Sequence, residues 1–117
     1  MVDDSETFQR VGESVVSAAE NLRLVGVAAS GEEAIRLLPE LKPDLVLLDV
    51  HMPGLSGLET APLIRSERPS TVIVLVSADP GSVAVDLPSI GVAAFLSKVE
   101  LSPHLLEQLW LAHLPLA

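Results

Sequence analysis

The sequence contains no cysteine, and aromatic residues make up only 3% of its 117 positions. Without cysteine there can be no disulfide, no thiolate nucleophile and no cysteine-based zinc site, which is typical of proteins from a reducing compartment. The scarcity of aromatic rings argues against platforms on which nucleic-acid bases would stack. We therefore expect a cytoplasmic protein that does not bind bases by stacking.

Positive charge is also scarce, with 7 Lys and Arg against 16 Asp and Glu and a net charge of −9. Phosphates would repel such a chain, so we expect no direct nucleic-acid partner and no binding to anionic lipid. No apolar run approaches the roughly 18 residues that a membrane span needs, and no basic segment precedes an apolar one. We therefore expect no membrane association.

The composition, 49% hydrophobic and 20% charged, is that of a globular chain, and the length suits a single domain over residues 1–117. Helical and strand-like patterns alternate along it. The periodicity from Phe8 to Leu22 predicts a helix. Apolar runs predict strands at 24–29, 45–48, 71–78 and 92–96, and helices are predicted to follow Ser30, Ser56, Asp79 and Ser102. Alternating strands and helices indicate a three-layer, doubly wound α/β fold with a parallel sheet.

Serine caps and prolines predict where the helices begin and end. Ser30 with Glu33, and Ser56 with Glu59, have the spacing of capping boxes. Pro62 would fall inside the helix after Ser56, so we expect a kink or a later start near Thr60.

Polar residues follow the apolar runs at the ends that a parallel sheet brings together. Asp49, Ser77 and Lys98 close three of these runs, and Asp3 and Asp4 lie just before the first helix. Carboxylates packed together repel one another, and a bound Mg²⁺ would remove that conflict. A carboxylate beside a metal ion and an ammonium is well placed to attack phosphorus. Taken singly, Asp3 and Asp4 are more often a helix-start acid pair, Ser77 and Lys98 are more often loop or surface groups, and Asp49 could equally be a loop acid. Their joint placement favours a shared site.

The segments Val2-Asp3-Asp4, Leu47-Leu48-Asp49-Val50-His51-Met52-Pro53-Gly54, Val76-Ser77-Ala78 and Phe95-Leu96-Ser97-Lys98 stand in a familiar order. In this respect the chain resembles the CheY-like receiver domain of bacterial response regulators, which serve two-component signalling. The resemblance implies a flavodoxin-like strand order 2-1-3-4-5.

The same resemblance assigns the acidic residues. Asp49 matches the phosphoacceptor, which receives a phosphoryl group from a sensor histidine kinase or a phosphotransfer protein. Asp4, Asp49 and the backbone carbonyl of His51 match the ligands of Mg²⁺, and Asp3 matches an acid that acts through a metal-bound water.

It also assigns the groups that respond to phosphorylation. Lys98 matches the lysine that binds the phosphoryl group, and Ser77 matches the hydroxyl that moves onto it. Phe95 matches an aromatic switch, and Ala78 a small residue that keeps the site open. We expect the added charge to shift a two-state equilibrium and so alter contacts with a downstream protein effector.

The chain departs from the family at its first strand. Only Met1 and Val2 precede Asp3, where the family has about five apolar residues in the middle of the sheet. The first strand is therefore truncated or missing. The reading frame could begin upstream, the sheet could have a gap, or another molecule could fill it. Val99 also replaces the family's usual proline after Lys98. We predict that His51 and Asp79 tune the lifetime of the phosphorylated state.

Three functions compete. The first is a phosphoacceptor module with no output domain in this chain, which assists its own phosphorylation and dephosphorylation but does not turn over a substrate. The second is a degenerate receiver used for docking or for homodimerisation, to which the apolar face around Trp110 could contribute. The third is a phosphotransferase of the haloacid-dehalogenase type, which would require an Asp at the position of His51.

Overall fold

The computed structural model describes residues 1–79, 81 and 91–113. Within these residues, three parallel strands form one sheet in the order β1-β2-β3. The elements in chain order are α1 (Glu6–Ala18), α2 (Gly31–Leu41), β1 (Leu45–Asp49), α3 (Gly57–Glu67), β2 (Val72–Ser77), β3 (Ala94–Ser97), the short 3₁₀ helix η2 (Lys98–Glu100) and α5 (Pro103–Ala112). The helix predicted after Asp79 lies outside the described residues.

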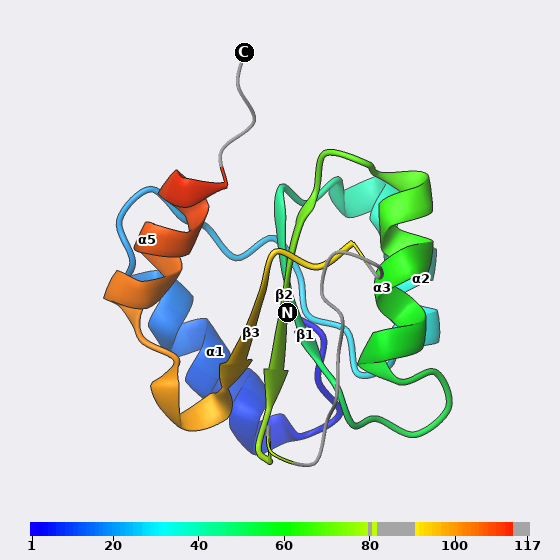
Figure 1. The fold of residues 1–117 in the computed structure, drawn as a ribbon, viewed down its shortest axis with the longest axis horizontal. Helices are drawn as coiled ribbons and strands as arrows, with labels where there is room; N and C mark the ends of the chain where they lie inside the picture. Colours follow the sequence, from blue (N-terminus) through cyan, green and yellow to red (C-terminus); the bar gives the residue numbers. More distant parts are fainter. Residues whose placement is uncertain (80, 82–90, 114–117) are drawn as a thin grey trace.

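The molecule has three layers, with α1 and α5 on one face of the sheet and α2 and α3 on the other (Figure 1). Leu47 and Val74 pack with Phe8 and Leu106 on the α1 and α5 side, and alternate strand residues pack on the opposite side. Every residue of β2 is buried. Burial on both faces is what parallel sheets require, and the predicted three-layer α/β fold is confirmed.

Serine side chains cap the helices as the sequence indicated. The Ser56–Glu59 capping box is complete. At Ser30, Glu33 instead accepts from the amide of Ala29, so that box is only half formed. The expected later start of α3 near Thr60 is wrong, because the helix begins at Gly57 and continues through Pro62. Proline removes one backbone donor, and the cap together with the burial of Ile64 holds the remaining turns.

The strand predicted over residues 24–29 is wrong. Only Ala28 pairs, through an isolated parallel bridge to Val2, and Val2 also bridges to Leu48 of β1. The order Ala28, Val2, β1, β2, β3 reproduces the expected 2-1-3-4-5 arrangement with its first strand reduced to one residue. Because a strand needs a partner along its length, residues 24–27 have no ladder to join.

A cavity of about 310 Å³ lies where the first strand would continue before Met1. Its walls come from the segment at residues 21–28, from α2, from β1 and from Trp110 of α5. The gap in the sheet is therefore a largely apolar hollow between Leu24 and Leu45, closed at one end by Met1 and Val2.

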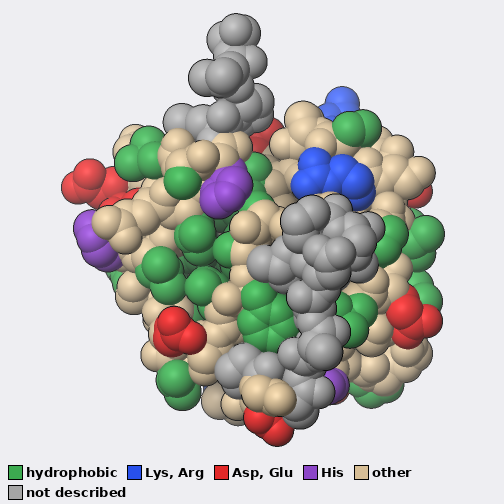
Figure 2. All heavy atoms as spheres, in the orientation of Figure 1, with side chains coloured by type: hydrophobic (Ala, Val, Ile, Leu, Met, Phe, Trp, Pro, Cys, Tyr) green, Lys and Arg blue, Asp and Glu red, His purple; other side chains and the backbone are tan. Residues whose placement is uncertain are grey.

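Other boundaries differ slightly from the sequence pattern. The first helix ends at Ala18 rather than near Leu22, and β3 covers Ala94–Ser97 rather than residues 92–96. On the face shown in Figure 2, apolar side chains gather over the α5 side, and most acidic groups lie around the edge. No helix within the described ranges is both long enough and apolar enough to span a membrane.

Candidate functional site

The carboxyl ends of the three strands point to the same end of the molecule (Figure 1). Asp49 is the last residue of β1, Ser77 is the last residue of β2, and Lys98 follows β3 directly. Asp49 is in register with Val76, and Ser77 is in register with Ser97. The topology therefore brings together residues that are 28 and 21 positions apart in the sequence.

Three carboxylates meet at this edge. One oxygen from each of Asp3, Asp4 and Asp49 lies within 4.8 Å of the others. Asp3 is fully buried and Asp49 is only 4% exposed, whereas Asp4 is exposed. The cluster therefore has an inner wall of two desolvated acids and an outer acid open to solvent.

Asp3 is held by the short N-terminal segment. The amide of Val2 donates to the carbonyl of Leu47 at 2.8 Å, and the amide of Asp3 donates to the carbonyl of Ala28 at 3.0 Å. The Oδ1 atom of Asp3 accepts from the amide of Ser5 at 2.8 Å. These bonds place Asp3 beside Asp49 although only two residues precede it.

Gly57 fixes the loop after Asp49. A Cβ atom at this position would lie 2.3 Å from the carbonyl oxygen of Asp49 and 2.9 Å from the Cα of Val50. Both neighbours are backbone, which cannot rotate away. Only glycine therefore lets the start of α3 pack this closely behind the nucleophile candidate.

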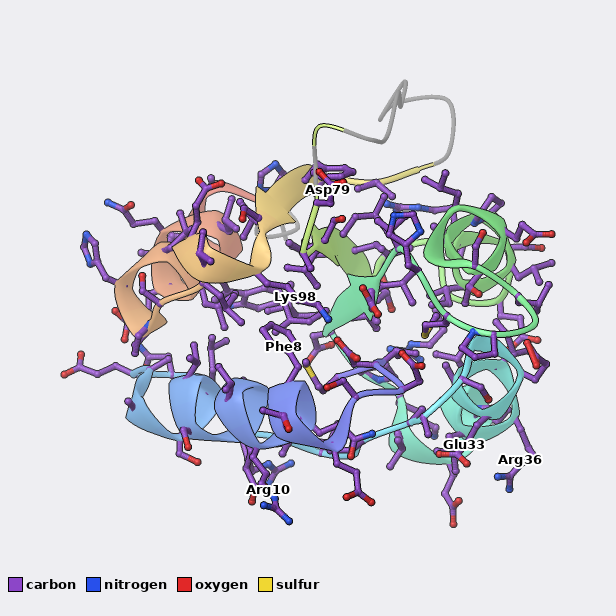
Figure 3. The ribbon with its side chains drawn as sticks, turned by 90° about the horizontal axis from the view of Figure 1, so that it is seen from below. Phe8, Arg10, Glu33, Arg36, Asp79 and Lys98 are labelled. Atoms are coloured by element: carbon purple, nitrogen blue, oxygen red, sulfur yellow. The ribbon has the colours of Figure 1, made fainter. Side chains whose placement is uncertain are left out.

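Lys98 enters the site from the end of β3. Its Nζ atom lies 2.8 Å from Asp3 Oδ2 and 3.6 Å from Asp49 Oδ1. A capping box between Ser97 and Glu100 shapes η2, the turn that begins at Lys98. Figure 3 shows Lys98 reaching toward α1, where Phe8 points at it.

The Lys98 ammonium also lies 4.4 Å from the centroid of the Phe8 ring. In the sequence pattern, Phe8 is only one residue of a helical stripe. Its position in the first turn of the helix that follows the acidic pair, on the face buried against the sheet, is the sequence feature that indicates a place near the site.

Ser77 is fully buried at the end of β2, and its Oγ accepts from the amide of Asp79 at 3.0 Å. In the described part of the chain, no ion pair or hydrogen bond joins Ser77 to Asp49 or Lys98. Ala78 and His51 are exposed, and Phe95 is half-buried against the core on the α2 and α3 side. The structure thus places Ser77 next to the site without a direct contact to the acids.

The surroundings of Asp49 raise the pKa of its carboxyl to about 6. Burial is the largest cause, and the negative charge of Asp3 adds to it, with a smaller contribution from Asp4. The Lys98 ammonium and the backbone N–H of His51 act in the opposite direction. Burial and the neighbouring carboxylates together therefore outweigh the effects of the Lys98 ammonium and of the His51 amide on this pKa.

These residues fit a hard divalent cation. Carboxylate oxygens are the ligands that Mg²⁺ prefers, and one exposed acid beside two buried ones leaves room for retained waters. Asp3 Oδ2 is buried and, within the described residues, accepts no hydrogen bond; its near neighbour is the Lys98 ammonium. Asp3, Asp4 and Asp49 could hold such an ion, and Lys98 would remain to contact an anion bound beside it.

Comparison with known proteins agrees with this geometry. Residues 1–109 match the family described as the response regulator receiver domain. The response regulator domain of Thermotoga maritima CheB has 28% sequence identity and a TM-score of 0.83, covering 99% of this chain and 95% of that one. Response regulator GacA of Pseudomonas aeruginosa is 36% identical over 99 residues, covering 84% of this chain and 46% of that protein.

A protein-glutamate methylesterase/protein-glutamine glutaminase of Trichodesmium erythraeum is 35% identical over 101 residues, covering 84% of this chain and 29% of that protein. The chain thus spans less than half the length of these curated relatives. The similarity concerns one part of each longer protein.

Proposed function

The chain belongs to the response regulator receiver domain family, and on that premise we propose that Asp49 accepts a phosphoryl group in two-component signalling. The donor would be a phosphohistidine of a sensor histidine kinase or of a phosphotransfer protein. The observation that carries the proposal is the meeting of Asp49 with Lys98, at 3.6 Å, beside the buried Asp3.

The chemistry follows from the charges. A carboxylate oxygen of Asp49 forms a bond to phosphorus while the bond from phosphorus to the donor nitrogen breaks. The electron pair returns to the imidazole, which takes up a proton from solvent. Phosphoryl transfer needs alignment and charge neutralisation more than covalent assistance, and Lys98 supplies a fixed positive charge beside the nucleophile.

Asp4 and Asp49, together with the carbonyl of His51, would hold Mg²⁺, and Asp3 would act through a bound water. When bound, Mg²⁺ neutralises charge on the phosphoryl oxygens and on the acids. Asp3 meanwhile keeps Lys98 at the site through its 2.8 Å contact.

The response would run through Ser77 and Phe95. A phosphorylated Asp49 adds acceptor oxygens that Lys98 and the Ser77 hydroxyl can bind in one conformation more than in another. To bind them, the Ser77 hydroxyl would have to leave its contact with the amide of Asp79. Phe95 would follow by packing inward, with Ala78 leaving room for these movements, and His51 and Asp79 would set how fast water removes the phosphoryl group.

We propose that the whole sequence, residues 1–117, is this one domain and that it acts in the cytoplasm. The phosphoacceptor reaction is stoichiometric, so we propose a signalling module rather than a turnover enzyme. Its downstream partner would be a protein effector that distinguishes the two conformations, and association as a homodimer is a further possible output.

Intact-mass measurement tests this function. The protein is incubated with acetyl phosphate and Mg²⁺, and we expect one added phosphoryl group, lost in Asp49→Asn. Asp44→Asn is the matched control, because Asp44 is an exposed acid just before the other end of β1. Labelling that survives in Asp49→Asn would refute the assignment.

A degenerate receiver that docks without phosphorylation is the alternative function. The same experiment distinguishes the two functions. If the wild-type chain gains no phosphoryl group, and if its amide NMR spectrum does not change on addition of beryllofluoride and Mg²⁺, the docking function replaces the phosphoacceptor function.

A further inference from the structure

We propose that Phe8 is a positioning residue for Lys98: the face of its ring holds the ammonium at the inner wall of the site, where Asp3 and Asp49 share it. This inference rests on the proposed phosphoacceptor function. It gives α1 a role in positioning the Lys98 ammonium, which the acidic and hydroxyl groups of the site do not explain.

The distance between Lys98 and Phe8 and the burial of both side chains support this proposal. Lys98 Nζ lies 4.4 Å from the Phe8 ring centroid, well within the roughly 6 Å range of a cation–π contact. Phe8 is only 9% exposed, and the Lys98 side chain is only 17% exposed. Such an interaction is stronger between desolvated groups than between groups at a surface.

The positions of the acids show what the ring contributes. Asp3 and Asp49 both lie close to Nζ, at 2.8 and 3.6 Å, and both draw the ammonium toward the cluster. The aromatic ring offers an uncharged, attractive surface to the same ammonium. In the view of Figure 3, Lys98 lies between Phe8 on α1 and the strand ends.

The helix itself fixes the ring. Ser5 caps α1 through the amide of Phe8 at 3.3 Å, and Gln9 donates to the carbonyl of Asp3 at 2.7 Å. The backbone that carries Phe8 is therefore tied to the turn that carries the acidic pair. The ring, the ammonium and Asp3 form one unit that is in place before any phosphoryl group arrives.

A ring-current measurement tests the contact without relying on activity. The ε-methylene protons of Lys98 lie next to an aromatic face, so we expect their NMR signals to be shifted upfield from those of the exposed Lys42. Phe8→Leu should remove the shift. Val16→Ala, a buried change on the same helix, should retain it.

A rate measurement tests the positioning role. With acetyl phosphate and Mg²⁺, we expect Phe8→Leu to lower the labelling rate of Asp49 by about three- to tenfold. Phe8→Tyr, which keeps the aromatic face, should restore most of the rate. Val16→Ala should change stability but leave the rate within about twofold.

The outcomes separate this inference from the function on which it rests. If wild type is not labelled, the phosphoacceptor function fails while the ring-current shift still decides the contact. If wild type is labelled and Phe8→Leu is labelled equally fast, Phe8 has no positioning role. A missing ring-current shift in wild type overturns the contact itself, whatever the rates.

Discussion

Asp49 donates its backbone N–H to the carbonyl of Val2 at 2.9 Å, which joins the proposed phosphoacceptor to the segment carrying the acidic pair. Leu47 on the same edge of β1 accepts from the amide of Val2. The two bonds set the register of Asp3 against Asp49, so one residue of the first strand is enough to build the acidic cluster. The site therefore depends on backbone pairing that side-chain motifs alone do not reveal.

Removing the Lys98 ammonium should destabilise the protein. Lys98→Met leaves the fully buried Asp3 without its partner and removes the charge that opposes the raised pKa of Asp49. We expect the free energy of unfolding at pH 7 without Mg²⁺ to fall by about 2–3 kcal/mol, less than for a fully buried pair because Lys98 is partly exposed. Urea titration measures the change.

Lys42→Met is the control for the lost charge, because Lys42 is an exposed lysine at the end of α2. Its replacement should change the unfolding free energy by no more than about 0.5 kcal/mol. If the two substitutions lowered the free energy of unfolding equally, the burial of the Asp3 carboxylate would not depend on the Lys98 ammonium.

The raised pKa of Asp49 predicts a pH dependence with a definite sign. Its folded-state pKa of about 6 lies above the ordinary carboxyl value of 3.8, so the folded protein binds the proton more tightly than the unfolded chain. The contribution of Asp49 to stability is therefore most favourable below pH 4. It is lost as pH rises through about 6.

Asp49→Asn should remove this dependence. Without Mg²⁺ we expect the variant to be more stable than wild type at pH 7, by on the order of 1–3 kcal/mol, with no difference near pH 4. Mg²⁺ should reverse the order at pH 7 by stabilising wild type alone. Parallel curves for the two proteins between pH 4 and pH 7 would contradict the assignment.

The sequence predicted the parts of this molecule that depend on local patterning. The run of β-branched residues ending at Ser77 predicted β2, and the serine caps predicted the starts of α2 and α5, whereas Pro62 made the start of α3 look later than it is. Asp49 and Lys98 could be placed together because parallel strands end at one edge. The structure places the Lys98 ammonium 3.6 Å from Asp49 Oδ1, at that edge.

What the sequence could not predict depends on contacts between distant segments. Residues 24–29 have the composition of a strand, but a strand forms only where a neighbour offers hydrogen bonds, and the backbone bonds from Met1 and Asp3 reach Ala28 alone of these residues. The ring of Phe8 meets Lys98 across 90 residues, and no local pattern encodes that meeting. Pro62 is tolerated for a similar reason, because the burial of Ile64 holds α3.

Gly57→Ala should damage both the fold and the site. The added Cβ would meet backbone atoms of Asp49 and Val50, so α3 must move away from the strand end. We expect a loss of about 1–3 kcal/mol in unfolding free energy and slower labelling of Asp49. In Gly81→Ala, the new Cβ would lie 3.8 Å from Asp79, an ordinary contact distance, and both quantities should change little. Thermal unfolding and intact mass measure them.

The cavity beside Met1 has an unused hydrogen-bonding edge. In a parallel ladder, residues that face one neighbour alternate with those that face the other. Leu47 and Asp49 bond to Val2, so the amides of Leu45 and Leu47 face the cavity. An added strand in register with Val2 would therefore find backbone partners as well as apolar walls on both sides.

Lengthening the chain should fill this cavity. We expect a Val-Ile-Val-Ile segment fused ahead of Met1 to raise the unfolding free energy by about 2–4 kcal/mol, because filling the 310 Å³ hollow gains more than ordering four residues costs. Urea titration measures the gain, and amide hydrogen exchange should slow at Leu45 and Leu47. A Gly-Ser-Gly-Ser segment of the same length should produce neither effect. If both segments act alike, the hollow does not accept a strand.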